Sequence, residues 1–386
     1  MKDSAIIPID VSAYFNEIKR HKNIILFGCG GKGREAVSIL TEYGIKIAAA
    51  CDNNKALWNC EFLNGIIIQP FEQVISSFED CCVIITCSII YATEIYRYLT
   101  TEYPSIPVYH LCNPFKIETK LLSETDFKDH EREILSSYNL LQDDESRKIF
   151  CDTLNWKLTG DMLPLNQYSL GYEAYSFFDE EFVHPDEQSV YVDVGAYTGD
   201  TIACFLMFAR GNFKKIIGVE ADYENYNALR QFVQFSRVKY IDTYNVALWS
   251  KEEKRTFYTN LVNETIHFGS PNLFKSVDML ADNDSLEQMK GKLEKKVLDV
   301  KTLDSLLKNE IPTIIKINAL AADQEIILGG QQTLKDYKPI LLLEFGSTLK
   351  AVYEIIPLIK KINNKYNFYM RRKRVFEDIK TVLYCI

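Results

Sequence analysis

The chain has 386 residues, of which 47% are hydrophobic, and it carries 53 acidic against 44 basic residues for a formal net charge of -9. This acidic balance argues against non-specific binding to nucleic acid or to an anionic membrane, because both need an excess of lysine and arginine. At about 150 residues per domain, the length predicts two or three domains. The partner that we expect is therefore a small molecule.

Ten cysteines are spread along the chain without a CxxC pair or a regular spacing. We therefore expect reduced core residues, with no metal site and no disulfide framework. The start of the sequence lacks a sustained apolar segment with a small-residue cleavage site, and no uncharged apolar run reaches about 18 residues. These features predict a cytoplasmic protein without a membrane-spanning segment.

The N-terminal third of the sequence predicts a small α/β domain. A helix over 11–22 comes first, and short apolar runs separated by helical patterns follow, as expected of a parallel sheet. The predicted strands lie at 24–27, 46–52, 66–69, 83–87 and 108–111. We place an N-terminal Rossmann-like domain at residues 1–122 and a charged helical connector at residues 123–179.

The turn after the first strand has the spacing GxGxxG, with glycines at Gly28, Gly30 and Gly33. Asp52 follows the second predicted strand, where the ribose-binding acid of a dinucleotide-binding protein lies. Locally this pattern indicates NAD. However, the domain holds only one nucleotide-binding half, and no adjoining domain offers obvious hydride-transfer chemistry. A Rossmann-like module without a nucleotide, used for substrate docking or for self-association into a homo-oligomer, is the other interpretation.

The remaining residues, 180–386, predict a second and larger α/β domain. Its strands are expected at 190–194, 215–220, 240–247, 313–318, 340–345, 367–371 and 381–386. The last two lack a long helix between them, which favours an antiparallel hairpin at the sheet edge. A polar stretch at 258–297, which contains His267, is longer than an ordinary connection and is a candidate wall of a substrate pocket. A basic run at 370–374 is typical of a solvated strand end.

The second domain contains the most informative turn of the sequence. Asp193 lies near the end of an apolar strand, and Gly195 and Gly199 follow it before a helical stretch. Glu220 ends the next strand, where a carboxylate can accept two hydrogen bonds from a ribose diol. This arrangement predicts a site for a nucleoside-containing cofactor.

Several blocks in this order resemble the FkbM family of S-adenosylmethionine-dependent methyltransferases. The blocks lie at 193–201, 218–221, 245–250, 300–304, 314–318, 353–357 and 381–384. The resemblance implies a class I methyltransferase sheet of seven strands with an antiparallel terminal hairpin, so that the chain holds two Rossmann-like domains. It also implies that Asp193, Gly195 and Gly199 surround the methionine part of the cofactor and that Glu220 binds its ribose.

The block after the fourth strand departs from the family pattern Ile-Lys-Met-Asp-Ile-Glu-Gly-Ala-Glu. Here Asn318 replaces the aspartate, Leu320 the first glutamate and Ala321 the glycine, while Asp323 stands at the final acid. An amide can orient a hydroxyl but cannot act as a general base. The catalytic candidates are Asn318, Asp323 and Glu344, with His267 as a further possible base, whereas we expect Lys316 to be structural.

Three functions follow from these patterns. The first is methyl transfer from S-adenosylmethionine to a hydroxyl of a saccharide or another small metabolite. The second is a catalytically impaired methyltransferase-like protein that binds the cofactor or a metabolite and acts as a regulatory partner. The third, based on the N-terminal glycines, is an NAD-dependent oxidoreductase.

Overall fold

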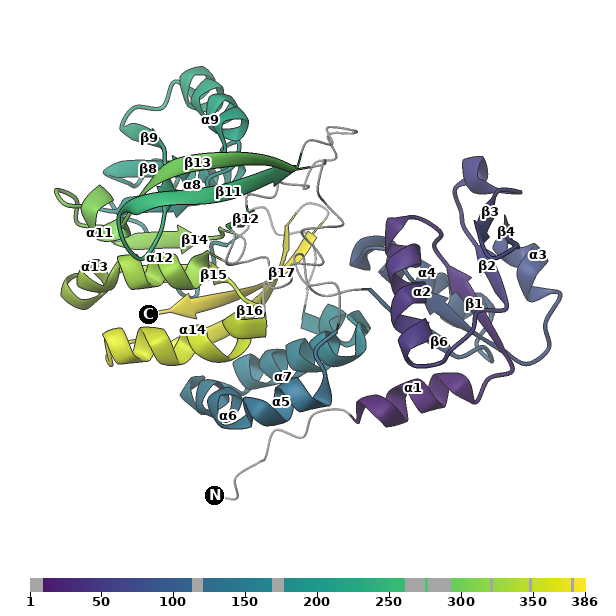
Figure 1. Ribbon diagram of the computed structural model, residues 1–386. Helices are drawn as coiled ribbons and strands as arrows, with labels where there is room; N and C mark the ends of the chain where they lie inside the picture. The colour runs from purple at the N-terminus through teal and green to yellow at the C-terminus, as the bar shows by residue number, and fades with distance from the viewer. Residues whose placement is uncertain are drawn as a thin grey trace. The chain divides into compact units, whose positions relative to one another are not determined.

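The computed structural model describes residues 10–112, 121–168, 177–260, 275–276, 293–319, 322–346, 349–375 and 378–386 (Figure 1). The chain forms two compact units. Unit 1 comprises Met1–Asn139, Asp143–Tyr172 and Phe376–Thr381, and unit 2 comprises Leu140–Gln142, Glu173–Val375 and Val382–Ile386. The domain boundaries predicted at 122 and 179 stay predictions.

Unit 1 contains a sheet with the strand order β3-β4-β2-β1-β5-β6 (Figure 1). The strands are β1 (Asn23–Phe27), β2 (Ala49–Cys51), β3 (Glu61–Leu63), β4 (Ile66–Gln69), β5 (Cys81–Ile85) and β6 (Val108–His110). Strand β1 pairs in parallel with both β2 and β5, and every residue of β5 is buried. Buried apolar strands of this kind are typical of a parallel sheet that is covered on both faces. The predicted Rossmann-like architecture is confirmed.

The helices of unit 1 follow the predicted order. They are α1 (Val11–Lys19), α2 (Gly31–Glu42), α3 (Phe71–Ile75), α4 (Ile89–Glu102), α5 (Glu124–Asp129), α6 (Glu131–Leu140) and α7 (Asp144–Thr159), followed by the 3-10 helix η2 (Leu163–Tyr168). Asp143 caps α7 by accepting from the Ser146 N–H at 2.7 Å, and Gly160 ends it in the left-handed conformation. None of the helices in the described part of the chain combines the length and apolar composition that a membrane crossing requires.

Unit 2 contains a seven-stranded sheet with the order β16-β17-β15-β14-β7-β8-β9. The strands are β7 (Val190–Val194), β8 (Lys215–Glu220), β9 (Ile241–Asn245), β14 (Ile314–Ile317), β15 (Ile340–Glu344), β16 (Phe368–Val375) and β17 (Asp378–Cys385). The five strands from β15 to β9 are parallel, and β17 lies antiparallel to β15. The predicted methyltransferase sheet with its antiparallel terminal hairpin is confirmed.

Helices and a second, small sheet complete unit 2. The helices are α8 (Asp200–Ala209), α9 (Tyr223–Ser236), α11 (Leu303–Leu306), α12 (Asp323–Gly329), α13 (Gln331–Asp336) and α14 (Leu349–Ile362). The small sheet has the order β10-β13-β11-β12, with β10 (Ala247–Leu248), β11 (Glu253–Asn260), β12 (Lys275–Ser276) and β13 (Leu293–Lys301). Strands β11 and β13 form a long antiparallel pair (Figure 1). Most of the predicted polar insertion, with His267, lies outside the described residues.

The cysteines are free, and most of them are buried. Burial, followed by the charge of Asp52, raises the pKa of the Cys29 thiol to about 12, and burial raises that of Cys82 to about 12. Burial also holds the pKa of Cys51 and Cys385 well above the ordinary value. The expected place of these cysteines in the core is confirmed, whereas Cys60 is exposed.

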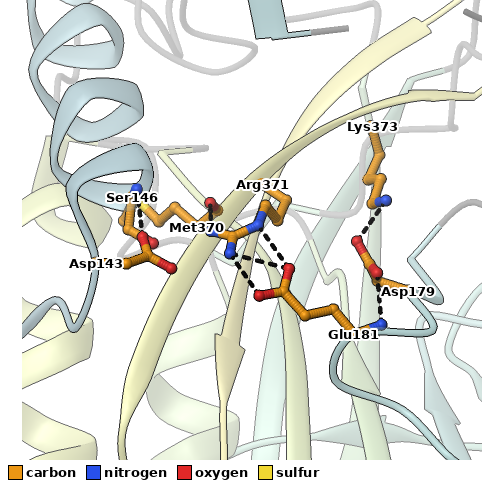
Figure 2. Close-up of polar contacts among 7 residues, drawn as sticks. All are labelled: Asp143, Ser146, Asp179, Glu181, Met370, Arg371 and Lys373. Carbon is orange, nitrogen blue, oxygen red and sulfur yellow. Dashed lines mark hydrogen bonds and ion pairs between the residues drawn. The ribbon is translucent and has the colours of Figure 1, made fainter. Parts of the chain in front are cut away.

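The basic run at 370–374 is not a solvated strand end, which corrects the expectation from the sequence. Figure 2 shows two of its side chains, Arg371 and Lys373, paired with acids of the segment that precedes β7. Arg371 donates to both carboxylate oxygens of Glu181 at 2.9 and 3.1 Å, and the Lys373 ammonium lies 2.6 Å from Asp179. Both cations are 8% exposed, because β16 is packed within the fold. Charge patterning along the sequence could not reveal acids about 190 residues away that neutralise the run.

We predict that Asp179→Asn removes part of the pH dependence of stability. Burial opposes ionisation of Asp179, but the hydrogen bond from Lys373 and the N–H of Glu181 outweigh it, so the pKa lies below the ordinary aspartate value. A carboxylate with a lowered pKa in the folded state stabilises the fold above its unfolded pKa, and this contribution is lost as the pH falls through the folded pKa. The variant should cost about 1 kcal/mol at neutral pH and nothing in strong acid.

Urea unfolding from pH 7 downwards measures this difference. Glu180→Gln is the control, because Glu180 is exposed. An Asp179→Asn variant that stayed equally destabilised across the whole pH range would contradict the assignment.

Candidate functional site

The carboxyl ends of four neighbouring strands bring most of the predicted site residues together in unit 2. Strand β7 leads into the turn at Gly195, β8 ends at Glu220, β14 is followed by Asn318, and β15 ends at Glu344. The register pairs Ile317 with Val194 on one side and with Leu343 on the other. Asn318 therefore lies at the sheet edge between Gly195 and Glu344. Ligands of open α/β sheets bind at this edge.

Packing within the protein explains why glycine is required at both positions of the turn. Gly195 has a φ of +73°, and a Cβ there would lie 2.2 Å from the carbonyl oxygen of Asn318. Gly199 has a φ of +95°, and its Cβ would lie 2.5 Å from the ring of Phe232. The sequence interpretation attributed both glycines to the approach of a ligand. Close packing and the left-handed backbone already require them, so their contact with a cofactor stays a prediction.

Glu220 is held by the backbone on both sides of its carboxylate. Oε2 accepts from the N–H of Tyr197 at 2.8 Å, and Oε1 accepts from the N–H of Asp222 at 2.9 Å. The amide of Asn245 donates to the carbonyl oxygen of Glu220 at 2.9 Å. Each carboxylate oxygen keeps a lone pair after these bonds, so it can accept a further donor such as a hydroxyl. Burial raises the pKa of Glu220, although the two N–H donors oppose this shift.

Asp193 forms a buried ion pair with Lys316. The ammonium lies 2.9 Å from Oδ1 of Asp193 and donates to the carbonyl oxygen of Gly195 at 2.8 Å. Asp193 is 0% exposed and Lys316 is 2% exposed, and the ring of Phe177 lies 5.5 Å from the ammonium. Lys316 therefore joins β14, β7 and the glycine turn.

The three catalytic candidates differ in what surrounds them. Asp323 is 2% exposed and accepts from the N–H of Ala319 at 2.8 Å, so it holds the start of the segment after β14. Glu344 is partly buried at the end of β15. Within the described residues, no hydrogen bond involves the Asn318 side chain. Leu320, Ala321 and His267 lie outside the described residues.

The N-terminal glycines and Asp52 also come together, in unit 1. Gly28, with a φ of +115°, ends β1, and Gly33 in α2 would place a Cβ 2.1 Å from the carbonyl oxygen of Gly28. Gly30 precedes α2 with nothing within 4 Å of a Cβ. Asp52 follows β2 and accepts from the N–H of Cys29 at 2.7 Å.

Sequence reasoning missed the partners that hold the two main carboxylates. Lys316 was expected to be structural, but nothing assigned it to Asp193, 123 positions away. One usable signal was that each of these two apolar strands contains a single charged residue, Asp193 in β7 and Lys316 in β14. The register then pairs these two residues. The N–H donors from Tyr197 and Asp222 carry no side-chain signal, because any residue supplies a backbone N–H.

Comparison with known proteins agrees with this geometry. Residues 193–368 match the family profile of the Methyltransferase FkbM domain. The crystal structure of a Methyltransferase FkbM from Methylobacillus flagellatus KT aligns over 100% of this chain and 96% of that chain, at 16% sequence identity and a TM-score of 0.67. This likeness shows that the two chains share a fold.

Other matches are more distant. A precorrin-6y C5,15-methyltransferase from Geobacter metallireducens GS-15 aligns over 55% of this chain and 85% of that chain, at 10% identity and a TM-score of 0.30. An rRNA methylase from Streptococcus thermophilus aligns over 52% of this chain and 88% of that chain, also at 10% identity and a TM-score of 0.30. A search among curated proteins gives no match.

We predict that Lys316→Met strongly destabilises unit 2. The substitution leaves the carboxylate of Asp193 buried without its cation, which typically costs about 3–5 kcal/mol. Adding Asp193→Asn to the same chain removes the stranded charge and should recover much of this loss. A double-mutant cycle from urea unfolding measures the coupling. Additive effects of the two substitutions would contradict the pairing.

Proposed function

We propose, from the FkbM methyltransferase domain that the chain carries, that this protein transfers a methyl group from S-adenosylmethionine to a hydroxyl of a saccharide or another small metabolite. The observation that carries the proposal is the position of Glu220. Its carboxylate is fixed at the carboxyl edge of the sheet by the N–H groups of Tyr197 and Asp222, and both oxygens can still accept a hydrogen bond. A ribose diol supplies two such donors at a matching spacing.

The charges around the glycine turn also suit this cofactor. Helix α8 begins at Asp200, so an acid lies in its first turn, which has no basic residue. A carboxylate there offsets the positive end of the helix dipole and favours a cationic ligand over an anionic one. S-adenosylmethionine carries a sulfonium and no phosphate. The residues that would hold it are Glu220 at the ribose and the turn from Gly195 to Gly199 beside the methionine part.

The bound cofactor supplies an activated methyl group, and the chain must place the acceptor in line with it. Such positioning alone accounts for several kcal/mol of barrier reduction, on the order of 7–11 in favourable cases. Asn318 lies at the centre of the edge and can orient a hydroxyl through its amide oxygen or nitrogen. Glu344, one strand away, is the carboxylate best placed to receive the proton of that hydroxyl. Asp323 is buried and holds Ala319, so positioning the loop is its clearest role.

The residues that follow β14 support a second candidate function. An amide at position 318 and an acid at 323 that is occupied by the backbone leave few groups that could act as a base. A protein that binds the cofactor without transferring the methyl group, and that acts as a regulatory partner, fits this arrangement. Activity measurements separate the two candidates, because tight cofactor binding is common to both.

We predict that Glu220→Ala lowers the affinity for S-adenosylmethionine by at least about tenfold, since two charge-assisted hydrogen bonds are lost. Isothermal titration calorimetry measures the affinity. Because burial raises the pKa of Glu220, binding to the native chain should weaken on acidification at a pH above the ordinary glutamate range. Glu224→Gln is the matched control, as Glu224 is an exposed acid in the first turn of α9. Equal affinities for the native chain and Glu220→Ala would remove the basis of the proposal.

We predict that Asn318→Ala lowers kcat about tenfold with little change in cofactor affinity, because the acceptor loses its orienting amide. The assay follows labelled methyl transfer to a panel of saccharides and small alcohols. Asn364→Ala is the control, because Asn364 is exposed and lies beyond α14. Cofactor binding without transfer to any acceptor would favour the regulatory function, and Asn318→Asp then tests whether a carboxylate creates activity.

A further inference from the structure

The three glycines of the GxGxxG turn between β1 and α2 in unit 1 differ in why glycine is found at their positions. Gly28 needs a left-handed backbone, with a φ of +115°, and Gly33 lets α2 pack on the carbonyl of Gly28. Gly30 has neither reason: its φ is −75°, and nothing lies within 4 Å of a Cβ built there. The chain therefore keeps an open space beside the first turn of α2. In nucleotide-binding turns, the middle glycine lets the backbone approach a diphosphate.

The carboxylate of Asp52 accepts backbone hydrogen bonds in the same pattern as that of Glu220 in unit 2. One oxygen of Asp52 accepts from the turn at the N–H of Cys29, 2.7 Å away, and the other accepts from the N–H of Asn54 at 2.8 Å. Glu220 likewise accepts from the turn and from the residue two positions further on. Glu220 is the last residue of β8 and Asp52 directly follows β2, and both carboxylates retain free lone pairs. The hydrogen-bonding pattern that suits a ribose diol in unit 2 is thus repeated in unit 1.

The charges at the two helix starts are opposite. Helix α8 has Asp200 in its first turn, whereas α2 has Lys32 there and no acid. Gly30, which precedes α2, gives no side-chain hydrogen bond to the exposed N–H groups. Lys32 also lies 3.9 Å from the carboxylate of Glu35, three residues further along α2. Because its first turn has no acid and no side-chain cap, the start of α2 keeps backbone N–H groups that can bind an anion, whereas α8 has an acid at the same place.

The position in the sheet agrees with a ligand site. Strand β1 has β2 on one side and β5 on the other, so the order in which the strands are added to the sheet reverses between β1 and β5. Ligands of open parallel sheets bind in the crevice at this point. Thr86, directly after β5, donates to the carbonyl oxygen of Gly28 at 2.7 Å and fixes the turn against the neighbouring strand.

We propose that unit 1 binds a nucleoside diphosphate group, with the ribose diol on Asp52 and the diphosphate on the N–H groups of residues 30–33 beside Lys32. The group can belong to a nucleoside diphosphate conjugate or to a dinucleotide such as NAD. This site is separate from the methyl-transfer site, and it does not depend on the function proposed for unit 2.

Calorimetric titration of the full chain with ADP, UDP, NAD and adenosine tests the proposal. ADP or UDP should bind saturably and at least about tenfold more tightly than adenosine, which lacks the diphosphate. NAD binding as tight as that of ADP identifies a dinucleotide site. Weaker binding of NAD identifies a site for a nucleoside diphosphate conjugate. Absence of saturable binding of all three phosphate-containing probes up to about 1 mM overturns the proposal.

Two variants locate the binding. Gly30→Val fills the open space at an ordinary φ and should abolish the binding. The control is Lys46→Gln, at an exposed position ahead of β2, which should leave the binding within about twofold. Lys32→Gln, at an exposed position, should weaken ADP about fivefold without affecting adenosine. Thermal unfolding of each variant checks that the fold is intact. ADP binding that is unchanged in both Gly30→Val and Lys32→Gln would place the nucleotide elsewhere and overturn the proposal.

Discussion

The contact on which the methyltransferase domain depends is the buried pair of Lys316 and Asp193. One ammonium satisfies a carboxylate on β7 and the carbonyl of Gly195, and it is itself carried by β14. A lone charge at this depth would be too costly to keep, so the two strands and the turn must adopt one arrangement together. The carbonyl of Asn318 lies against Gly195 in the same arrangement. The glycine turn after β7 and the residue after β14 are therefore coupled through a single cluster.

The two units hold a carboxylate in the same way but differ in the charge of the neighbouring first helical turn. In each unit a carboxylate at the end of the second strand accepts N–H groups from the glycine turn and from the following loop. The fold fixes the carboxylate but leaves the first helical turn free to vary. An acid, Asp200, lies in the first turn of α8, whereas a lysine, Lys32, lies in the first turn of α2.

Much of the architecture could be predicted from the sequence, because apolar runs report burial directly. Strands β7 and β8 have the predicted bounds, since each is a short buried run that ends at a turn or a loop. The sheet edge at which Asp193, Glu220 and Asn318 meet was predicted for the same reason. The burial of Arg371 and Lys373 was not, because their acids come from a segment far away in the sequence. The structural reasons for Gly195 and Gly199 also need coordinates, since a close contact with another strand or helix leaves no trace in the local sequence.

The rate at which the buried thiols of each unit are alkylated reports how often that unit opens. Alkylating reagents attack only thiolates, and burial keeps Cys51 and Cys82 of unit 1 and Cys385 of unit 2 in the protonated form. In the native protein, reagent should therefore reach the exposed Cys60 first. Modification of the buried positions occurs only as fast as the surrounding strands separate. The kinetics of labelling at Cys51 and at Cys385 thus reveal whether the two halves of the chain unfold together or independently.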